Sequence, residues 1–298
     1  GEDHLKLAVV GSKGQLGSDC VSIMGSHYDV VGLDLPEFDV TDEAAVDSTV
    51  RSCHPDVILN CAGLTCVDDC ETNREAAWRA NALGPLHLAR AARTTGATLV
   101  QISTDYVFDG AKPLPQPYVE SDEARPLSWY GETKLGGERA VVENADRFIV
   151  LRTARLYGRH GRNFPKRILQ LALSNPGKTL RVVNDQYGSP TWSHRLVAQI
   201  HKAVDCGCRG IYHATAEGSC SWYVFARRFL DLMKVEHALA PCRTDEYPTP
   251  ARRPANSILE NSRLKAAGIN VMKEWDVDLE EFVATSREEL LKEARRRT

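Results

Sequence analysis

The sequence has no excess of positive charge. Its 298 residues contain 37 Lys and Arg against 40 Asp and Glu, which gives a formal net charge of −3. Nucleic acids and anionic membranes attract proteins mainly through clustered positive charge. We therefore expect no nucleic-acid partner.

Long hydrophobic runs are also missing. The longest mainly apolar runs, such as Leu5 to Val10 and Ala97 to Ile102, are far shorter than the roughly 20 residues that a helix needs to cross a bilayer. No signal-peptide pattern opens the chain. We expect a soluble cytoplasmic protein without a membrane partner.

The spacing of the cysteines excludes two further classes. Nine cysteines scattered through a long chain do not form the disulfide framework of a small secreted domain. Neither the cluster Cys61, Cys66 and Cys70 nor the close pair Cys206 and Cys208 has the paired spacing of a structural zinc site. Since no carboxylate cluster indicates a magnesium site either, we expect reduced thiols and no metal.

A glycine-rich segment near the start carries the first positive signal. The buried-strand pattern Leu5 to Val10 runs directly into Gly11, Gly14 and Gly17, and a helical stretch follows. Glycines in this order allow a tight turn and let a pyrophosphate approach the amide groups at the start of the helix. The segment predicts a dinucleotide site, although an ordinary glycine-rich turn could have the same sequence pattern.

The second strand, Tyr28 to Leu33, ends at Asp34. An acidic group about twenty residues after the glycines can bind a ribose 2′-hydroxyl and would repel a 2′-phosphate, which favours NADH. Lys13 could offset that repulsion, so NADPH and NADH both stay open. Asp39 and Val40 are expected near the adenine. Asp42 belongs either there or, with Thr41, at the cap of a helix from 43 to 52.

The order of elements predicts an α/β fold, a Rossmann-type doubly wound parallel sheet with a smaller C-terminal substrate-binding lobe. Further strands are expected at 56–59, 97–102 and 147–151, and a helix at 74–93 with a kink or break at Pro85. We expect residues 1–154 to form the dinucleotide-binding domain and 155–298 the substrate lobe. Part of 180–215 should return to the first sheet.

Polar and small residues follow two of these strands. Asn60 to Gly63 leaves room for a cofactor at the carboxyl edge of the sheet, or forms a tight strand exit. Ser103, Thr104 and Asp105 end the fourth strand. A hydroxyl there can bind a substrate carbonyl oxygen, or it can bond its own backbone in a turn.

Tyr130 and Lys134 are four residues apart in a predicted helix and therefore share one face. A phenol has a pKa of about 10, and an adjacent ammonium group would lower that value. The pair makes Tyr130 a candidate general acid or base for interconverting a carbonyl and an alcohol.

These features occur in the order typical of extended short-chain dehydrogenase/reductases. Longer stretches resemble the dTDP-4-dehydrorhamnose reductase family over about residues 5–282, namely 103–110, 130–138, 183–191 and 253–257. The resemblance implies hydride transfer from NADPH or NADH to the 4-keto carbon of a dTDP-linked 6-deoxyhexose, forming dTDP-L-rhamnose.

The resemblance also implies roles for individual residues. Tyr130 would donate the proton, Thr104 would orient the keto oxygen, and Lys134 would bind the nicotinamide ribose and lower the Tyr130 pKa. The implied cofactor contacts are Gly11, Gly14, Gln15, Leu16, Gly17, Asp34, Asp39, Val40, Ala62, Gly63, Thr65, Ser103, Tyr130 and Lys134. The implied contacts with the dTDP-sugar are Thr104, Asp105, Tyr106, Arg155, Asn163, Asp185, Gln186, Arg253 and Asn256.

One departure from the family pattern concerns the sugar. Arg155 stands where many members have a tryptophan that packs on the deoxysugar, and a cation cannot supply that apolar face. Two alternatives stay open: an extended epimerase or dehydratase that recycles NAD, and a non-catalytic regulatory subunit that only binds a dinucleotide. The sequence also leaves a homodimer open.

Overall fold

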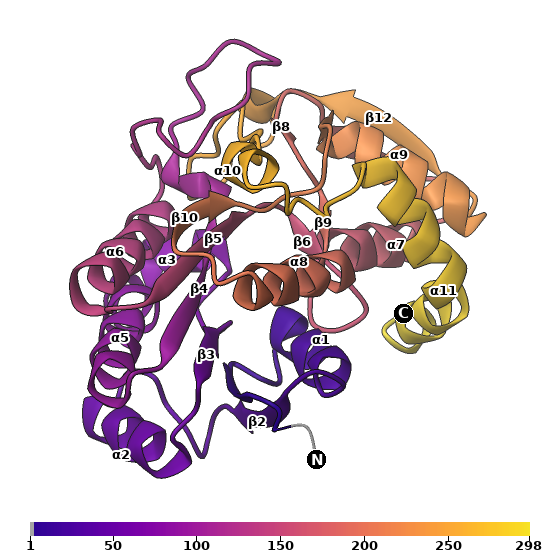
Figure 1. The fold of residues 1–298 in the computed structure, drawn as a ribbon. Coiled ribbons are helices and arrows are strands. Elements are labelled where there is room, and N and C mark those ends of the chain that lie inside the picture. Colours follow the sequence, from indigo (N-terminus) through magenta and orange to yellow (C-terminus); the bar gives the residue numbers. More distant parts are fainter. Residues whose placement is uncertain (1–2) are drawn as a thin grey trace.

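The computed structural model describes residues 3–298. Over that range, six parallel strands form one sheet in the order β10-β5-β4-β3-β1-β2 (Figure 1). Their bounds are β1 (Lys6–Val10), β2 (Asp29–Leu33), β3 (Val57–Asn60), β4 (Thr98–Thr104), β5 (Phe148–Thr153) and β10 (Gly210–His213). Strand order reverses between β1 and β3, the point at which open α/β sheets bind ligands. The expected doubly wound parallel sheet is confirmed.

Helices cover both faces of this sheet (Figure 1). On one face, α1 (Gln15–Met24) packs against α8 (Ser193–Asp205). On the other lie α2 (Glu43–Cys53), α5 (Gly84–Thr95) and α6 (Trp129–Asn144). The strands are apolar on both sides, as expected for a parallel sheet buried between two helical layers.

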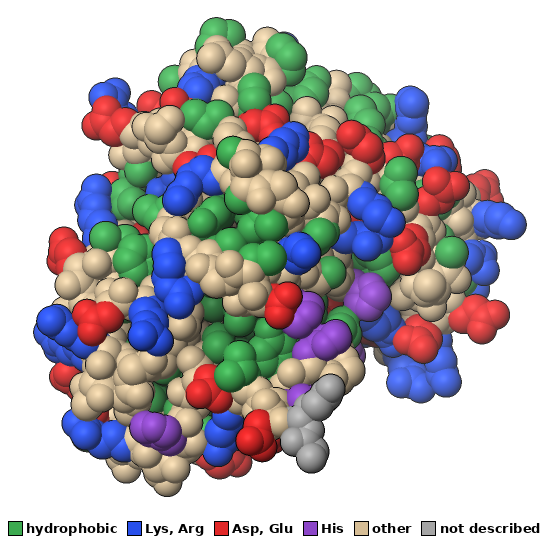
Figure 2. Space-filling model, viewed as in Figure 1, with side chains coloured by type: hydrophobic (Ala, Val, Ile, Leu, Met, Phe, Trp, Pro, Cys, Tyr) green, Lys and Arg blue, Asp and Glu red, His purple; other side chains and the backbone are tan. Residues whose placement is uncertain are grey.

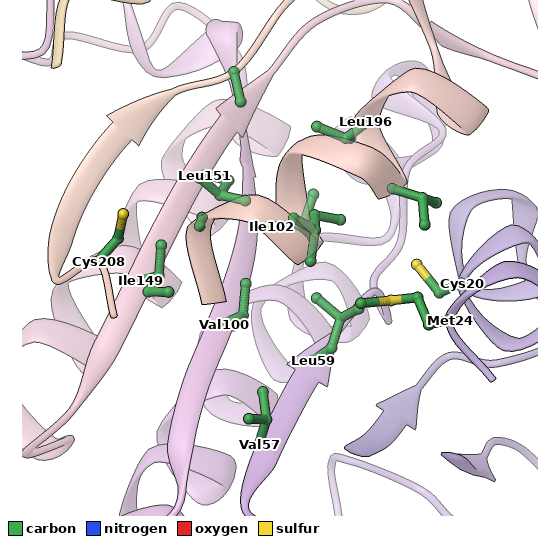
Figure 3. Close-up of a cluster of buried hydrophobic side chains, with 14 of the residues drawn as sticks. Cys20, Met24, Val57, Leu59, Val100, Ile102, Ile149, Leu151, Leu196 and Cys208 are labelled. Carbon is green, nitrogen blue, oxygen red and sulfur yellow. The ribbon is translucent and has the colours of Figure 1, made fainter. Parts of the chain in front are cut away.

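Figure 3 shows the core between the sheet and the first helical layer. Leu59, Val100 and Leu151 come from three neighbouring strands and are fully buried. They face Met24 of α1 and Leu196 of α8. Burying such side chains supplies much of the stability that holds the carboxyl edge of the sheet in place.

The remaining chain builds a second hydrophobic cluster, which includes the buried rings of Phe225, Phe229 and Phe282. Its helices are α7 (Phe164–Ser174), α9 (Trp222–Met233) and α11 (Trp275–Arg296). Paired strands are β6 (Leu156–Tyr157) with β9 (Thr191–Trp192), β7 (Thr179–Val183) with β12 (Ala238–Cys242), and β8 (Tyr187–Gly188) with β11 (Cys220–Ser221). Helix α10 (Ser262–Ala266) packs on β10, so residues from the second half of the chain complete the first sheet.

The segment expected as one helix over 74–93 is divided in the structure. After α3 (Val67–Thr72) come α4 (Arg74–Trp78), a π-helical turn over Arg79–Leu83, and then α5. Pro85 lies in the first turn of α5, where its missing N–H costs no hydrogen bond. Helical structure continues through Pro85, so no break occurs at this residue, and the helix type instead changes in the π-helical turn, which was not expected.

Side-chain caps fix the starts of two helices. Asp42 accepts a hydrogen bond from the amide of Ala45 at 3.1 Å, which makes it the cap of α2. Ser128 accepts one from the amide of Gly131 at 3.1 Å and caps α6. A cap of this kind contributes about 1 kcal/mol, and the cap of α6 fixes the turn that carries Tyr130.

The surface agrees with the charge count. On the face in Figure 2, acidic and basic side chains are interspersed rather than gathered into a field of one sign. No helix within residues 3–298 combines the length and apolar character needed to cross a membrane.

The central core predicts a stability difference between two leucines. Leu59→Ala leaves a cavity at a side chain that is 0% exposed, so we expect a loss of about 3 kcal/mol in the free energy of unfolding. Leu64→Ala removes a side chain that is 41% exposed and should cost under about 0.5 kcal/mol. Urea unfolding followed by circular dichroism measures both. Equal losses would contradict this description of the core.

Candidate active site

The glycine loop lies at the carboxyl end of β1 and leaves no room for side chains. Gly11 has φ +76°, and its amide donates to the carbonyl of Leu33 at 2.8 Å. A Cβ on Gly17 would lie 2.0 Å from the carbonyl oxygen of Gly11. Gly14 caps α1 without a side-chain hydrogen bond, so the first amides of that helix are not engaged by a capping side chain. Such a cradle at a helix start suits a phosphate group.

The acidic residues after β2 are bonded to the protein itself. Asp34 accepts from the amides of Lys13 at 2.9 Å and Leu35 at 2.7 Å. Asp39 accepts from both the amide and the hydroxyl of Thr41. These carboxylates shape the loop, and each keeps lone pairs for a further donor.

The loop after β3 is held by a residue that the sequence analysis missed. Asn81, in the π-helical turn, accepts from the amide of Leu64 at 2.8 Å and donates to its carbonyl at 3.0 Å. It also donates to the Thr133 hydroxyl of α6 at 3.1 Å. Its oxygen would lie 2.8 Å from a Cβ on Gly63, so this glycine is required there. An Asn in an alanine-rich helix was the one available signal, and π-helical turns are frequent at functional sites.

The neighbours of this loop are placed as follows. Ala62 donates its amide to Asn60 at 3.1 Å, and Thr65 is exposed. Val40 is buried, and its carbonyl contacts the His87 ring at 2.9 Å.

Thr104 and Tyr130 meet at the carboxyl end of β4. Thr104 donates to Asp105 at 3.0 Å and accepts from the amide of Tyr106 at 3.1 Å. The ring of Tyr106 meets that of Tyr130 edge to face, with centroids 6.2 Å apart. Burial raises the pKa of the Tyr130 phenol well above its usual range, and a hydrogen bond with Thr104 opposes this shift.

Lys134 lies on the same face of α6, as its spacing predicted, and is 6% exposed. Its amine donates to the carbonyl of Ile102 at 2.8 Å and lies 3.9 Å from a Cβ built on Gly63. Burial lowers the pKa of Lys134 to about 8. The expected lowering of the Tyr130 pKa is absent from this structure, because desolvation of the phenol dominates and the amine bonds to the backbone.

Ser103 points away from Thr104, as alternation along a strand requires. Its hydroxyl donates to Glu138 of α6 at 2.5 Å. The side chain expected to contact the cofactor is therefore engaged within the protein.

Two residues expected to bind the substrate, Asp105 and Tyr106, lie beside this centre. Asp105 is 3% exposed and its Oδ2 has no hydrogen-bond partner. Burial raises its pKa to about 6, while the neighbouring Ser257 hydroxyl and the charge of Arg155 oppose the shift. Burial likewise raises the pKa of Tyr106 to about 12, despite the opposing charges of Arg155 and Arg253.

Arg155 has an unusual backbone and an incompletely used side chain. Its φ is +46°, a strained value for a residue with a side chain. The guanidinium stacks over Trp222 at 4.0 Å and donates to the carbonyl of Cys220 at 3.1 Å, but its Nε has no partner. These contacts fix the direction of the guanidinium and leave its Nε–H without a hydrogen-bond partner.

Arg253 lies between Asp68 of α3 and Tyr106. It bonds to Asp68 of α3 at 2.5 Å, and the same carboxylate accepts from the amide of Ala251 at 3.1 Å. The charge of Arg253 also opposes the rise in the pKa of Tyr106, whose ring meets that of Tyr130. The structure therefore brings Arg253 together with Tyr106, Asp105 and Arg155.

Two further predicted residues, Gln15 and Asn163, bond to each other across a long stretch of the sequence. Gln15 accepts from Asn163 at 2.8 Å and donates to the carbonyl of Leu156 at 3.2 Å. The oxygen of Asn163 caps α7 through the amide of Lys166. Leu16, beside Gln15, is buried in the core against the sheet.

Asp185 and Gln186 are bonded within the second half of the chain, whereas Asn256 reaches back to the first half. Asp185 accepts from the amide and hydroxyl of Thr244, and Gln186 bonds to Thr244 and Trp222. Asn256 is fully buried, and its amide bonds only backbone groups, among them the carbonyl of Gln116 at 2.7 Å. The structure does not bring Asn256 to the site, because its donors bond the loop before α6 and its oxygen accepts from the amide of Ile258.

Comparisons of this chain with a family model and with individual known proteins indicate the same family. The RmlD substrate binding domain model matches residues 5–288. A dTDP-4-dehydrorhamnose reductase of Streptomyces griseus is 39% identical over 281 residues, covering 92% of this chain and 91% of the relative. One from Mycobacterium tuberculosis is 37% identical over 276 residues, covering 91% and 90%.

Solved structures agree. A dTDP-4-dehydrorhamnose reductase from Clostridium acetobutylicum has a TM-score of 0.91 and 39% identity, covering 94% of this chain and 99% of its own. One from Bacillus anthracis, in complex with NADP, has a TM-score of 0.91 and 34% identity, covering 95% and 99%. With a family model spanning most of its length and relatives this similar, the chain belongs to the dTDP-4-dehydrorhamnose reductase family.

Proposed function

We propose that the protein is an NAD(P)H-dependent reductase of dTDP-4-dehydro-L-rhamnose, forming dTDP-L-rhamnose. One observation carries this proposal: Thr104, Tyr130 and Lys134 converge at the carboxyl end of β4, beside the glycine loop of β1. Relatives over 35% identical are dTDP-4-dehydrorhamnose reductases, which supports the same reaction and the same class of substrate.

The residues present fit a dinucleotide. Side chains at Gly11 and Gly17 would collide with the loop backbone, so the cradle at the start of α1 can accept a pyrophosphate. Asp34 and Asp39 would face the adenosine ribose. Ala62, Gly63 and Thr65 would line the middle of the cofactor, and Lys134 would bind the nicotinamide ribose. When bound, the reduced nicotinamide supplies a hydride.

Three side chains would act on the sugar carbonyl. Thr104 would turn its hydroxyl proton from Asp105 to the keto oxygen, and Tyr130 would transfer its own proton to that oxygen as the alcohol forms. Because burial raises the pKa of Tyr130, the phenol carries the required proton at neutral pH. Lys134 supplies a positive charge that stabilises the phenolate left after proton transfer.

The substrate side of the centre is polar. Asp105 and Tyr106 border Tyr130, and the charges of Arg155 and Arg253 act on these two residues in turn. These groups suit the hydroxyls of a hexose and the phosphates of a nucleotide. The engaged side chains of Asn163, Asp185, Gln186 and Asn256 would shape this surface through the loops they hold.

We also propose a cytoplasmic location. All nine cysteines are free, in keeping with a reducing compartment. A homodimer stays a prediction, to be tested by light scattering.

Tyr130→Phe removes the proton donor and keeps the ring that packs edge to face on Tyr106. We expect turnover of dTDP-4-dehydrorhamnose to fall about a thousandfold. The affinity for NADPH, measured by fluorescence titration, should be unchanged. Turnover near the wild-type rate would remove Tyr130 from the mechanism, and loss of NADPH binding would show a structural defect instead.

Arg155→Trp replaces the guanidinium beside Asp105 with an apolar ring. We expect the ratio of kcat/KM for 6-deoxy and 6-hydroxy 4-keto sugars to rise at least about tenfold, while NADPH affinity stays the same. Arg167→Trp, on the exposed side of α7, is the matched control. Equal changes in sugar and cofactor affinity would assign Arg155 a purely structural role.

A further inference from the structure

A buried ion pair lies directly behind the catalytic residues. Glu138 of α6 is 2% exposed and Arg152 of β5 is 4% exposed. The guanidinium of Arg152 donates to both carboxylate oxygens of Glu138, at 2.7 and 2.9 Å. Ser103 donates to the same carboxylate at 2.5 Å. Burying two charges is costly unless their hydrogen bonds are nearly complete, as they are here.

Glu138 lies one helical turn beyond Lys134, on the same face of α6. Both side chains reach the end of β4, at adjacent residues: Lys134 bonds to the carbonyl of Ile102, and Glu138 accepts from Ser103. The next residue of that strand is Thr104. Two side chains of one helix therefore fix the strand end that carries the catalytic hydroxyl.

The charged and titratable groups around Lys134 come from several elements. Helix α6 supplies Glu138 and Tyr130, while the thiols of Cys61 and Cys70 approach from the β3 loop and α3. Arg152 and His213 lie behind Glu138, and Nη1 of Arg152 is 3.3 Å from Nε2 of His213. Burial and the charge of Arg152 lower the pKa of His213 to about 3, so this imidazole is neutral and adds no charge.

Glu138 is therefore the carboxylate that most directly favours a charged Lys134. Burial lowers the pKa of this lysine to about 8, and among the opposing groups Glu138 contributes most. Loss of that negative charge would lower the pKa further and reduce the fraction of Lys134 that is protonated near neutral pH.

Resting on the proposed reductase activity, we propose that Glu138 is a positioning residue that keeps Lys134 protonated and aligned with Thr104. It touches neither sugar nor cofactor and acts through its neighbours on α6 and β4. The reductase thereby retains turnover at higher pH than a buried lysine alone would allow.

The test is the pH dependence of kcat for dTDP-4-dehydrorhamnose with saturating NADPH. Turnover needs protonated Lys134, so the rate falls as pH rises through the pKa of that lysine. In Glu138→Gln, which keeps the shape and loses the charge, this alkaline limb should move about 1 pH unit lower. Glu138→Asp keeps the charge and should restore the limb to within about 0.3 unit of wild type, even if kcat falls.

Glu143→Gln is the matched control, because it removes one negative charge from the exposed part of the same helix. The alkaline limb of its kcat–pH profile should coincide with that of the wild-type protein. If Glu138→Gln is too unstable to purify, Glu138→Gln/Arg152→Met removes both buried charges together, and its limb should again lie lower.

A lower rate at every pH with an unmoved limb in both Glu138→Gln and the double variant would overturn the proposal and leave Glu138 a structural role. An equal displacement in Glu138→Asp would also overturn it, because the charge would then be irrelevant. Absence of turnover by the wild-type protein would instead contradict the reductase function itself.

Discussion

The site depends on how α6 packs against the end of β4. Lys134 and Glu138 bond to consecutive residues of that strand, and Ser128 fixes where the helix begins. Tyr130 and Thr104 therefore face each other because one helix and one strand are held in a single register. All other parts of the site are arranged around this contact: the glycine loop on one side, and Tyr106, Arg155 and Arg253 on the other.

Desolvation governs the chemistry of this contact more strongly than any single charge pair. It raises the pKa of Tyr130 and Asp105 and lowers that of Lys134, so each group is displaced toward its neutral form. A protonated phenol suits a reductase, which must give a proton to the substrate. The same desolvation disfavours the charged form of Lys134, and the buried carboxylate of Glu138 opposes this effect.

Much of this arrangement follows from local patterns in the sequence. The spacing of Tyr130 and Lys134 sets one face of a helix, and a glycine loop after a buried strand sets the turn at Gly11, so both were predictable. Hydrogen-bond partners distant in sequence were not. Asn256 bonds to the loop before α6, and Glu138 of α6 pairs with Arg152 of β5. No local sequence pattern predicts either partner. The π-helical turn that presents Asn81 depends on packing against α6, which propensities do not encode.

The reaction proposed for this centre delivers a hydride to the 4-keto carbon of a dTDP-sugar and releases the alcohol. The most direct measurement uses NADPH carrying deuterium at the transferred position of the nicotinamide, with dTDP-4-dehydrorhamnose as the substrate. We expect one deuterium per product molecule, located at carbon 4 of the sugar by NMR. A product without deuterium, or with the label at another carbon, would contradict it.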